Sequence, residues 1–185
     1  FFTYKGKFGK YIPAFKFRLS RRIVSSLLKI GIPSSLSLFV EVAAFSLAGI
    51  MVGWFGEASL ASHHIALNLA SVTYMTVVGF SVAGNIRTGN YFGERNLGKI
   101  KETAASVIIS ASALMLFTAV IFITFRNQLP QIFSASPDVV SLSATLLVTA
   151  GFFQIFDGLQ AVTSGVLRGL TDVRIPMLII IFSYW

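Results

Sequence analysis

The stretch IGIPSSLSLFVEVAAFSLAGIMVGWF, residues 30–55, decides the fold class of this 185-residue chain. It is longer than the run of about 20 apolar residues that a helix needs to cross the hydrocarbon core of a bilayer. A strand of a membrane barrel needs only about ten residues of alternating polarity. The length of the stretch therefore predicts a transmembrane helix. Its one charged residue, Glu41, needs a separate explanation.

Three further apolar spans follow at residues 61–86, 103–125 and 139–167, and a partial fifth covers residues 175–185. The chain is 55% hydrophobic and 12% charged, with a mean hydropathy of +0.77, whereas about a quarter of the residues of a soluble domain are charged. We therefore predict an all-α membrane protein, a polytopic bundle of four full transmembrane helices and part of a fifth. The lack of cysteine excludes a disulfide framework, a thiolate metal site and a thiol nucleophile.

The basic residues are concentrated in the first part of the chain. Residues 1–29 hold eight of the 15 basic residues and no acidic residue. A basic segment with interleaved Phe and Tyr could bind nucleic acid, but this one leads directly into an apolar span. We interpret it as a basic cytoplasmic loop beside anionic lipid headgroups, with residues 30–185 as the membrane domain, and expect no nucleic-acid partner.

The other basic residues predict the orientation of the spans. If the N-terminal segment is cytoplasmic and the spans alternate, 14 of the 15 basic residues lie on the cytoplasmic side and only Arg126 lies outside. Cytoplasmic loops carry an excess of Lys and Arg, so this orientation is strongly favoured. The chain begins at Phe1 and ends within an apolar run at Trp185, which we interpret as a piece of a longer protein.

Two acidic residues lie within the apolar spans, Glu41 and Asp157. Glu41 is 12 residues beyond Lys29, and Asp157 is 11 residues before Arg168. Both therefore lie about 16–18 Å from the cytoplasmic ends of their predicted helices. That depth is near the middle of a hydrocarbon core about 30 Å thick, so we expect two carboxylates at one level of the membrane.

A charged carboxylate at the centre of a bilayer costs about 2.5–3.5 kcal/mol on insertion scales. The cost falls when the group is protonated, paired or bound to a cation, and no basic residue lies in the spans at that depth. We therefore predict that Glu41 and Asp157 bind H⁺ or Na⁺, for which carboxylate oxygens are suitable. The alternative is that each acid is hydrogen-bonded to a neighbouring helix and only orders the packing.

Small and polar residues accompany each acid on one face of its predicted helix. Ser37 lies on the face of Glu41, and Gln154 and Ser164 lie on the face of Asp157, so we expect both faces to point into the bundle. Asn68 lies on a polar face of the span 61–86 and suits either an interhelical hydrogen bond or a cavity wall. A line of glycines predicts close helix packing: Gly151, Gly158 and Gly165.

Two other signals are weaker. His63 and His64 are adjacent, so their side chains point about 100° apart and cannot form an i, i+4 metal pair. The segment GERNLGKI, residues 93–100, nearly matches G-x-x-x-x-G-K-[ST], but Ile100 replaces the hydroxyl residue and an apolar span precedes it instead of a strand. We therefore predict no nucleotide site, and no metal beyond Na⁺ at the two acids.

Three segments resemble the multidrug and toxic compound extrusion (MATE) family of transporters, in particular its NorM-like branch. GIPSSLSLFVEVAAFS, residues 31–46, resembles the start of the second lobe of these proteins. LASHHIALNLASVTYM, residues 60–75, resembles the eighth helix, and FQIFDGLQAVTSGVLRGLTDVRIPM, residues 153–177, resembles the tenth helix and the loop after it. The resemblance covers most of the chain from Lys29 onward.

The resemblance implies a twelve-helix transporter of two six-helix lobes, of which this chain would supply the inter-lobe loop, helices seven to ten and the start of helix eleven. It implies a Na⁺- or H⁺-coupled antiporter that exports organic, often cationic, drugs across the cell membrane, with Glu41 and Asp157 in cation binding. Some members carry Tyr at the position of Phe153 and many carry Gln at the position of His64, so Phe153 would leave the site without one hydroxyl ligand. The expected partners are drug molecules, lipid and the first lobe, without which we expect the chain to be inactive.

Other functions remain open at this point. A related lipid-linked saccharide flippase would have a basic, water-filled cavity. An intramembrane hydrolase would hold its two carboxyl groups within hydrogen-bond reach of a shared water. A non-transporting membrane scaffold would tolerate substitution of both acids. We favour the antiporter, which has no enzymatic activity and no cofactor besides its coupling ion.

Overall fold

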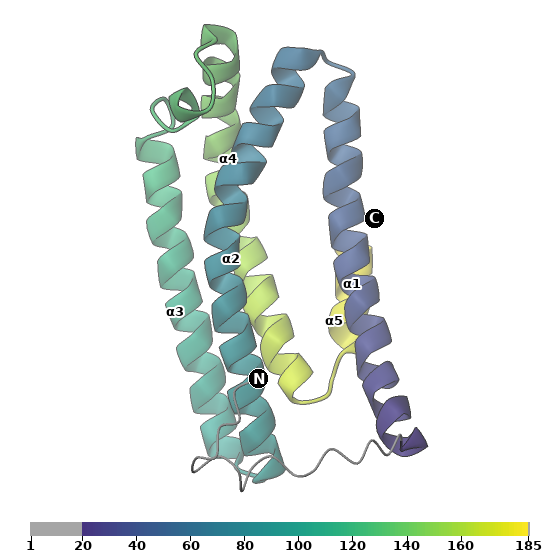
Figure 1. The fold of residues 1–185 in the computed structure, drawn as a ribbon. Coiled ribbons are helices and arrows are strands. Elements are labelled where there is room, and N and C mark those ends of the chain that lie inside the picture. Colours follow the sequence, from purple (N-terminus) through teal and green to yellow (C-terminus); the bar gives the residue numbers. More distant parts are fainter. Residues whose placement is uncertain (1–19, 185) are drawn as a thin grey trace, which may run out of the picture.

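The computed structural model describes residues 20–184, and residues 1–19 and 185 lie outside the described part of the chain (Figure 1). The elements are α1 (Arg21–Gly53), α2 (Glu57–Gly93), α3 (Leu97–Thr124), the short 3-10 helix η2 (Pro130–Ile132), α4 (Pro137–Gly169) and α5 (Arg174–Tyr184). Helices α1 to α4 are each long and apolar enough to cross a membrane. The predicted class, a polytopic all-α membrane protein, is confirmed.

The helices extend beyond the predicted apolar spans. Residues 21–29, predicted as the end of a loop, form the first turns of α1, while nearly all of the remaining predicted loop lies outside the described residues. Helix α2 runs from Glu57 to Gly93 instead of from residue 61 to residue 86. The reason is that charged side chains end an apolar run without ending a helix, which stops at Gly, Pro or a cap. Residues 21–29 contain neither Gly nor Pro.

The segment GERNLGKI, residues 93–100, contains the tight turn between α2, which ends at Gly93, and α3, which begins at Leu97. Arg95 has a φ of 56°, and the side-chain oxygen of Asn96 accepts a hydrogen bond from the backbone N–H of Lys99 at 3.1 Å. Asn96 is therefore the N-cap of α3, which satisfies one of the free N–H groups at the start of the helix. The segment is a capped turn between two helices.

Helices α2, α3 and α4 pack together as a three-helix group. Its core holds Val77, Ala111, Met115 and Val162, and a second cluster holds Ala66, Phe122 and Leu147. The glycines of α4 lie at the contacts, as their spacing predicted. Gly165 lies against Ser81 of α2 and Gly158 against Met115 of α3, so closely that a Cβ at either position would overlap its neighbour.

Helices α1 and α5 form a separate pair. They pack against each other, and α1 has a smaller contact with α2. Figure 1 shows this pair on one side of the molecule and the three-helix group on the other, with α1 and α2 joined by the turn at one end. No residue of α1 is buried. The fold thus consists of a packed three-helix group and a more loosely attached helix pair.

Candidate functional site

Glu41 and Asp157 line one cavity between the helix pair and the three-helix group. The cavity has a volume of about 990 Å³ and is lined by residues of α1, α2, α3 and α4. Glu41 lies in the middle part of α1, and Asp157 lies in the second half of α4. Both carboxylates are only partly exposed. Two acids that are far apart in the sequence therefore lie on the same cavity.

Each carboxylate accepts a hydrogen bond from a tyrosine of another helix. The hydroxyl of Tyr74, on α2, donates to Oε1 of Glu41 at 3.1 Å. The hydroxyl of Tyr184, on α5, donates to Oδ1 of Asp157 at 3.3 Å. A hydrogen bond to a charged group is stronger than one between neutral groups, so each phenol offsets part of the cost of placing its acid in an apolar environment.

These two contacts also hold the two parts of the fold together. Tyr74 links α2 to α1, and Tyr184 links α5 to α4. Within residues 20–184 they are the side-chain hydrogen bonds that join the helix pair to the three-helix group. Any change in the charge or ligand of either acid therefore acts directly on the connection between the two parts.

Aromatic rings form part of the wall beside Asp157. The ring of Phe45 lies edge-on to that of Phe153, with centroids 5.9 Å apart, and is tilted against that of Tyr184 at 6.1 Å. Phe153 and Phe45 both line the large cavity. Phe153 therefore contributes an aromatic ring to the site. The phenol hydroxyl groups are supplied by Tyr74 and Tyr184 instead.

Gln154 is buried and links three helices. Its Oε1 lies 2.8 Å from the hydroxyl of Thr73 on α2, and its Nε2 donates to the hydroxyl of Thr118 on α3 at 3.3 Å. The residue is 5% exposed. Although it lines the cavity, its polar atoms are directed to neighbouring helices, which gives it a supporting role beside Asp157.

Ser37 and Ser164 lie on a second, smaller cavity. This cavity has a volume of about 250 Å³ and shares Glu41 and Tyr74 with the large one. The hydroxyl of Ser37 donates to the carbonyl of Pro33 at 2.9 Å. Arg168, near the end of α4, lines the same small cavity, so a cation shares this cavity with Glu41.

Asn68 does not join the predicted site. Its side chain is exposed on α2, and it lines neither cavity. Its neighbours in the sequence, Leu67 and Ser71, do line the large cavity. The polar face of α2 is thus rotated so that Asn68 points away from the two acids.

Sequence reasoning missed four polar side chains near the two acids, of which Tyr74, His63 and His64 line the large cavity. Tyr74 and Tyr184 donate hydrogen bonds to the two acids. The two imidazole rings lie 6.3 Å apart, and Nε2 of His63 is buried and has no hydrogen-bond partner among the described residues. The sequence did contain a signal for the two tyrosines. A tyrosine hydroxyl within an apolar span needs a hydrogen-bond partner, so Tyr74 and Tyr184 were candidates to contact the acids.

Within residues 20–184, no three His, Cys, Asp or Glu side chains gather closely enough to hold a metal ion. The oxygen atoms beside each acid are those of its carboxylate and of one uncharged tyrosine hydroxyl. Such a set suits a hard, weakly held ion that can leave again, or a proton, and is unlike a structural transition-metal site.

Comparison with known proteins gives one consistent result. The family model described as MatE matches residues 33–185. The chain is 35% identical over 161 residues to a probable multidrug resistance protein NorM of Rhizobium meliloti, covering 84% of this chain and 34% of that protein. It is 33% identical over 181 residues to a probable NorM of Shewanella oneidensis, covering 97% and 39%. It is 32% identical over 164 residues to the multidrug resistance protein MdtK of Yersinia pseudotuberculosis, covering 89% and 36%. The chain spans about a third of the length of these relatives.

Proposed function

Because the chain belongs to the MatE family, we propose that it is part of a membrane exporter of organic, often cationic, drugs. In this proposal Glu41 and Asp157 bind the coupling cation, Na⁺ or H⁺, and the protein is an antiporter without enzymatic activity. The relatives that are named multidrug resistance proteins support the class of substrate. The observation that carries the proposal is the pair of carboxylates on one cavity of about 990 Å³.

The lining of the cavity supports an organic cation as the exported molecule. In the described part of the chain, this lining has two carboxylates, the aromatic rings of Phe45 and Phe153, and no Lys or Arg. A cationic ring system gains from both features, since carboxylates attract its charge and aromatic faces bind cations by cation–π contact. A lipid-linked saccharide would instead favour a basic cavity, so this lining supports the exporter over the flippase.

The hydrogen bonds of the two acids suggest how cation binding acts on the protein. A proton or Na⁺ on Glu41 or Asp157 neutralises the charge that strengthens the phenol's hydrogen bond, and the phenol oxygen can then turn toward the cation. The contact between the helix pair and the three-helix group is then weakened, which favours a different arrangement of the two. A cation shifts such an equilibrium only through its different affinity for the two arrangements. In the complete protein, this change would accompany the rocking of one lobe against the other.

The complete transporter in this proposal has two six-helix lobes in the cell membrane. The described helices belong to the second lobe, and the basic residues at the beginning of the chain lie on the cytoplasmic side. The first lobe, membrane lipid and the drug are the partners. The coupling ion is the only small ligand besides the drug, and the chain without the first lobe is inactive.

Drug efflux by the full-length protein tests the proposal. Glu41→Gln and Asp157→Asn keep the size of each side chain and remove its charge, and each should abolish most ion-dependent efflux. Glu94→Gln is the matched control, because Glu94 is exposed after the end of α2 and lines neither cavity. Equal membrane expression of all variants is the required check. Unchanged, ion-dependent efflux in the double variant would refute the proposal.

A further inference from the structure

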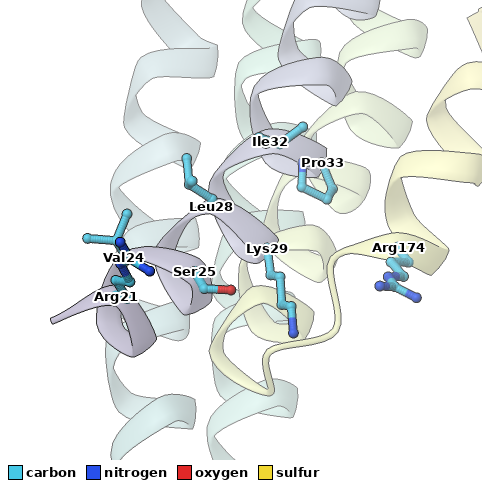
Figure 2. Close-up of a pocket in the computed structure, with 8 residues that line it drawn as sticks. All are labelled: Arg21, Val24, Ser25, Leu28, Lys29, Ile32, Pro33 and Arg174. Atoms are coloured by element: carbon cyan, nitrogen blue, oxygen red, sulfur yellow. The ribbon is translucent and has the colours of Figure 1, made fainter.

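A separate cavity lies where α1 and α5 begin, on the outside of the helix pair (Figure 2). It has a volume of about 700 Å³ and contains neither Glu41 nor Asp157. Among residues 20–184, three cations line it, Arg21 and Lys29 of α1 and Arg174 of α5, and no acidic residue does. All three basic side chains are exposed. The cavity thus gathers positive charge from two helices that are distant in the sequence.

The rest of the lining is apolar. Val24, Leu28 and Ile32 are four residues apart, so they form a stripe along α1, and Leu28 and Ile32 are 53% and 61% exposed. Figure 2 shows the charged ends of Lys29 and Arg174 pointing away from Ile32 and Pro33. The cavity therefore has a charged end and an apolar end.

The position of the cations along their helices fixes the depth of the cavity. Lys29 directly precedes the apolar span 30–55, and Arg174 directly precedes the apolar residues 175–185. Both side chains are thus at a boundary between an apolar run and a polar segment, and α1 packs against α5. In a bilayer this level is that of the lipid headgroups.

We propose that this cavity binds an anionic phospholipid, with the phosphate between Lys29 and Arg174 and an acyl chain along Leu28 and Ile32. The order of charged and apolar groups in the cavity is the order of headgroup and chain in such a lipid. A guanidinium can bind two phosphate oxygens at once, and a lysine supplies a mobile point charge. No acid occurs before Glu41 in the sequence, and Asp172, near Arg174, is not part of the lining.

Native mass spectrometry of the full-length protein tests the proposal with two lipids that share the same acyl chains, phosphatidylglycerol and phosphatidylcholine. Phosphatidylglycerol should bind more tightly, and each cation removed should weaken that binding about fivefold, so Lys29→Gln with Arg174→Gln should weaken it about 25-fold. Lys101→Gln removes an exposed cation of α3 outside this cavity and should have little effect. Equal binding of the two lipids by the unaltered protein would overturn the proposal, since the cations would then not recognise the charge of the headgroup.

Two further arms separate the sources of phosphate and the effects of folding. Ile32→Ser should weaken phosphatidylglycerol binding about threefold or more, because it removes apolar contact with the acyl chain, and inorganic phosphate should not displace the lipid. Displacement by inorganic phosphate at equal concentration would show a free-phosphate site and contradict the lipid assignment.

Lys29→Arg with Arg174→Lys keeps both charges and should retain the lipid. Loss of binding in this variant, with unchanged helix content, would also contradict the proposal. Drug efflux is not measured here, so this result is independent of the proposed function.

Discussion

At the scale of single residues, the site depends on contacts between phenol and carboxylate groups. Glu41 and Asp157 each accept one hydrogen bond from a tyrosine of another helix. An isolated charged acid at the middle of the membrane has a high free energy. The hydrogen bond from the phenol lowers that free energy and uses only one of the two carboxylate oxygens. The same hydroxyl oxygen can turn toward a cation on the acid, so the two tyrosines supply oxygen atoms that Phe153 lacks.

Where Na⁺ is the coupling ion of the proposed function, Tyr74→Phe should raise the Na⁺ concentration needed for half-maximal efflux about tenfold. A hydrogen bond to a charged group contributes about 1.5–3 kcal/mol, and its loss leaves Glu41 without the contact that positions it. The measurement is efflux by the full-length protein over a series of Na⁺ concentrations. Tyr91→Phe is the matched control, because its hydroxyl accepts a hydrogen bond from Arg87 and it lies outside the large cavity. Equal responses of the two variants would show that the contact with Glu41 has no special role.

At the scale of helices, the packing of α4 on α2 depends on glycines that allow the two backbones to approach. The Cβ of an alanine at Gly165 would overlap the hydroxyl of Ser81 and lie 2.5 Å from its carbonyl oxygen. At Gly151 the nearest atom is the carbonyl oxygen of Ala119 at 3.5 Å, an ordinary contact. Two glycines of one helix therefore have different tolerance for a methyl group.

Gly165→Ala should destabilise the protein by about 1–3 kcal/mol, the usual cost of forcing extra volume into a packed contact. Gly151→Ala should be neutral or stabilise the protein by up to about 1 kcal/mol, because alanine has the higher helix propensity. Thermal unfolding in detergent measures both effects. A fall in Tm for Gly151→Ala equal to that for Gly165→Ala would contradict the close contact between Gly165 and Ser81.

At the scale of the whole molecule, the helix pair α1 and α5 and the three-helix group α2 to α4 form two parts with different packing. The group has a buried core, whereas α1 has no buried residue. The large cavity lies between these parts, and both acids lie on it. Relative movement of the two parts would therefore change the cavity without disturbing the core of either.

The orientation of the bundle in the membrane is a prediction that also concerns the whole molecule. It rests on the distribution of basic residues, which places the turn between α2 and α3 on the cytoplasmic side. Because the chain contains no cysteine, single cysteines can report on each side. Glu94→Cys, after the end of α2, should react with a membrane-impermeant maleimide only after the cells are permeabilised. Gln128→Cys, between α3 and η2, should react in intact cells. The reverse pattern would invert the predicted topology.

Several features could be predicted from the sequence because they depend on local properties. The length of an apolar run determines whether a helix can cross a bilayer, and residues 30–55 therefore gave the correct class. The spacing of Gly151, Gly158 and Gly165 also predicted close packing, because it places three small residues on one face of a helix. The end of the predicted loop at residue 29 was wrong, because charge marks where an apolar run ends and a helix continues until a breaker or cap.

The sequence by itself determined that the chain is a helical membrane protein with one acid in each of two apolar spans, since run length and charge are read directly from neighbouring residues. Only the tertiary structure decided that Glu41 and Asp157 line one cavity, that Tyr74 and Tyr184 are their partners, and that Asn68 points elsewhere. The physical reason is that contacts between helices depend on the rotation of each helix about its axis. A turn of 100° per residue means that this rotation decides which side chain faces a neighbour, and it is set by packing against all the other helices.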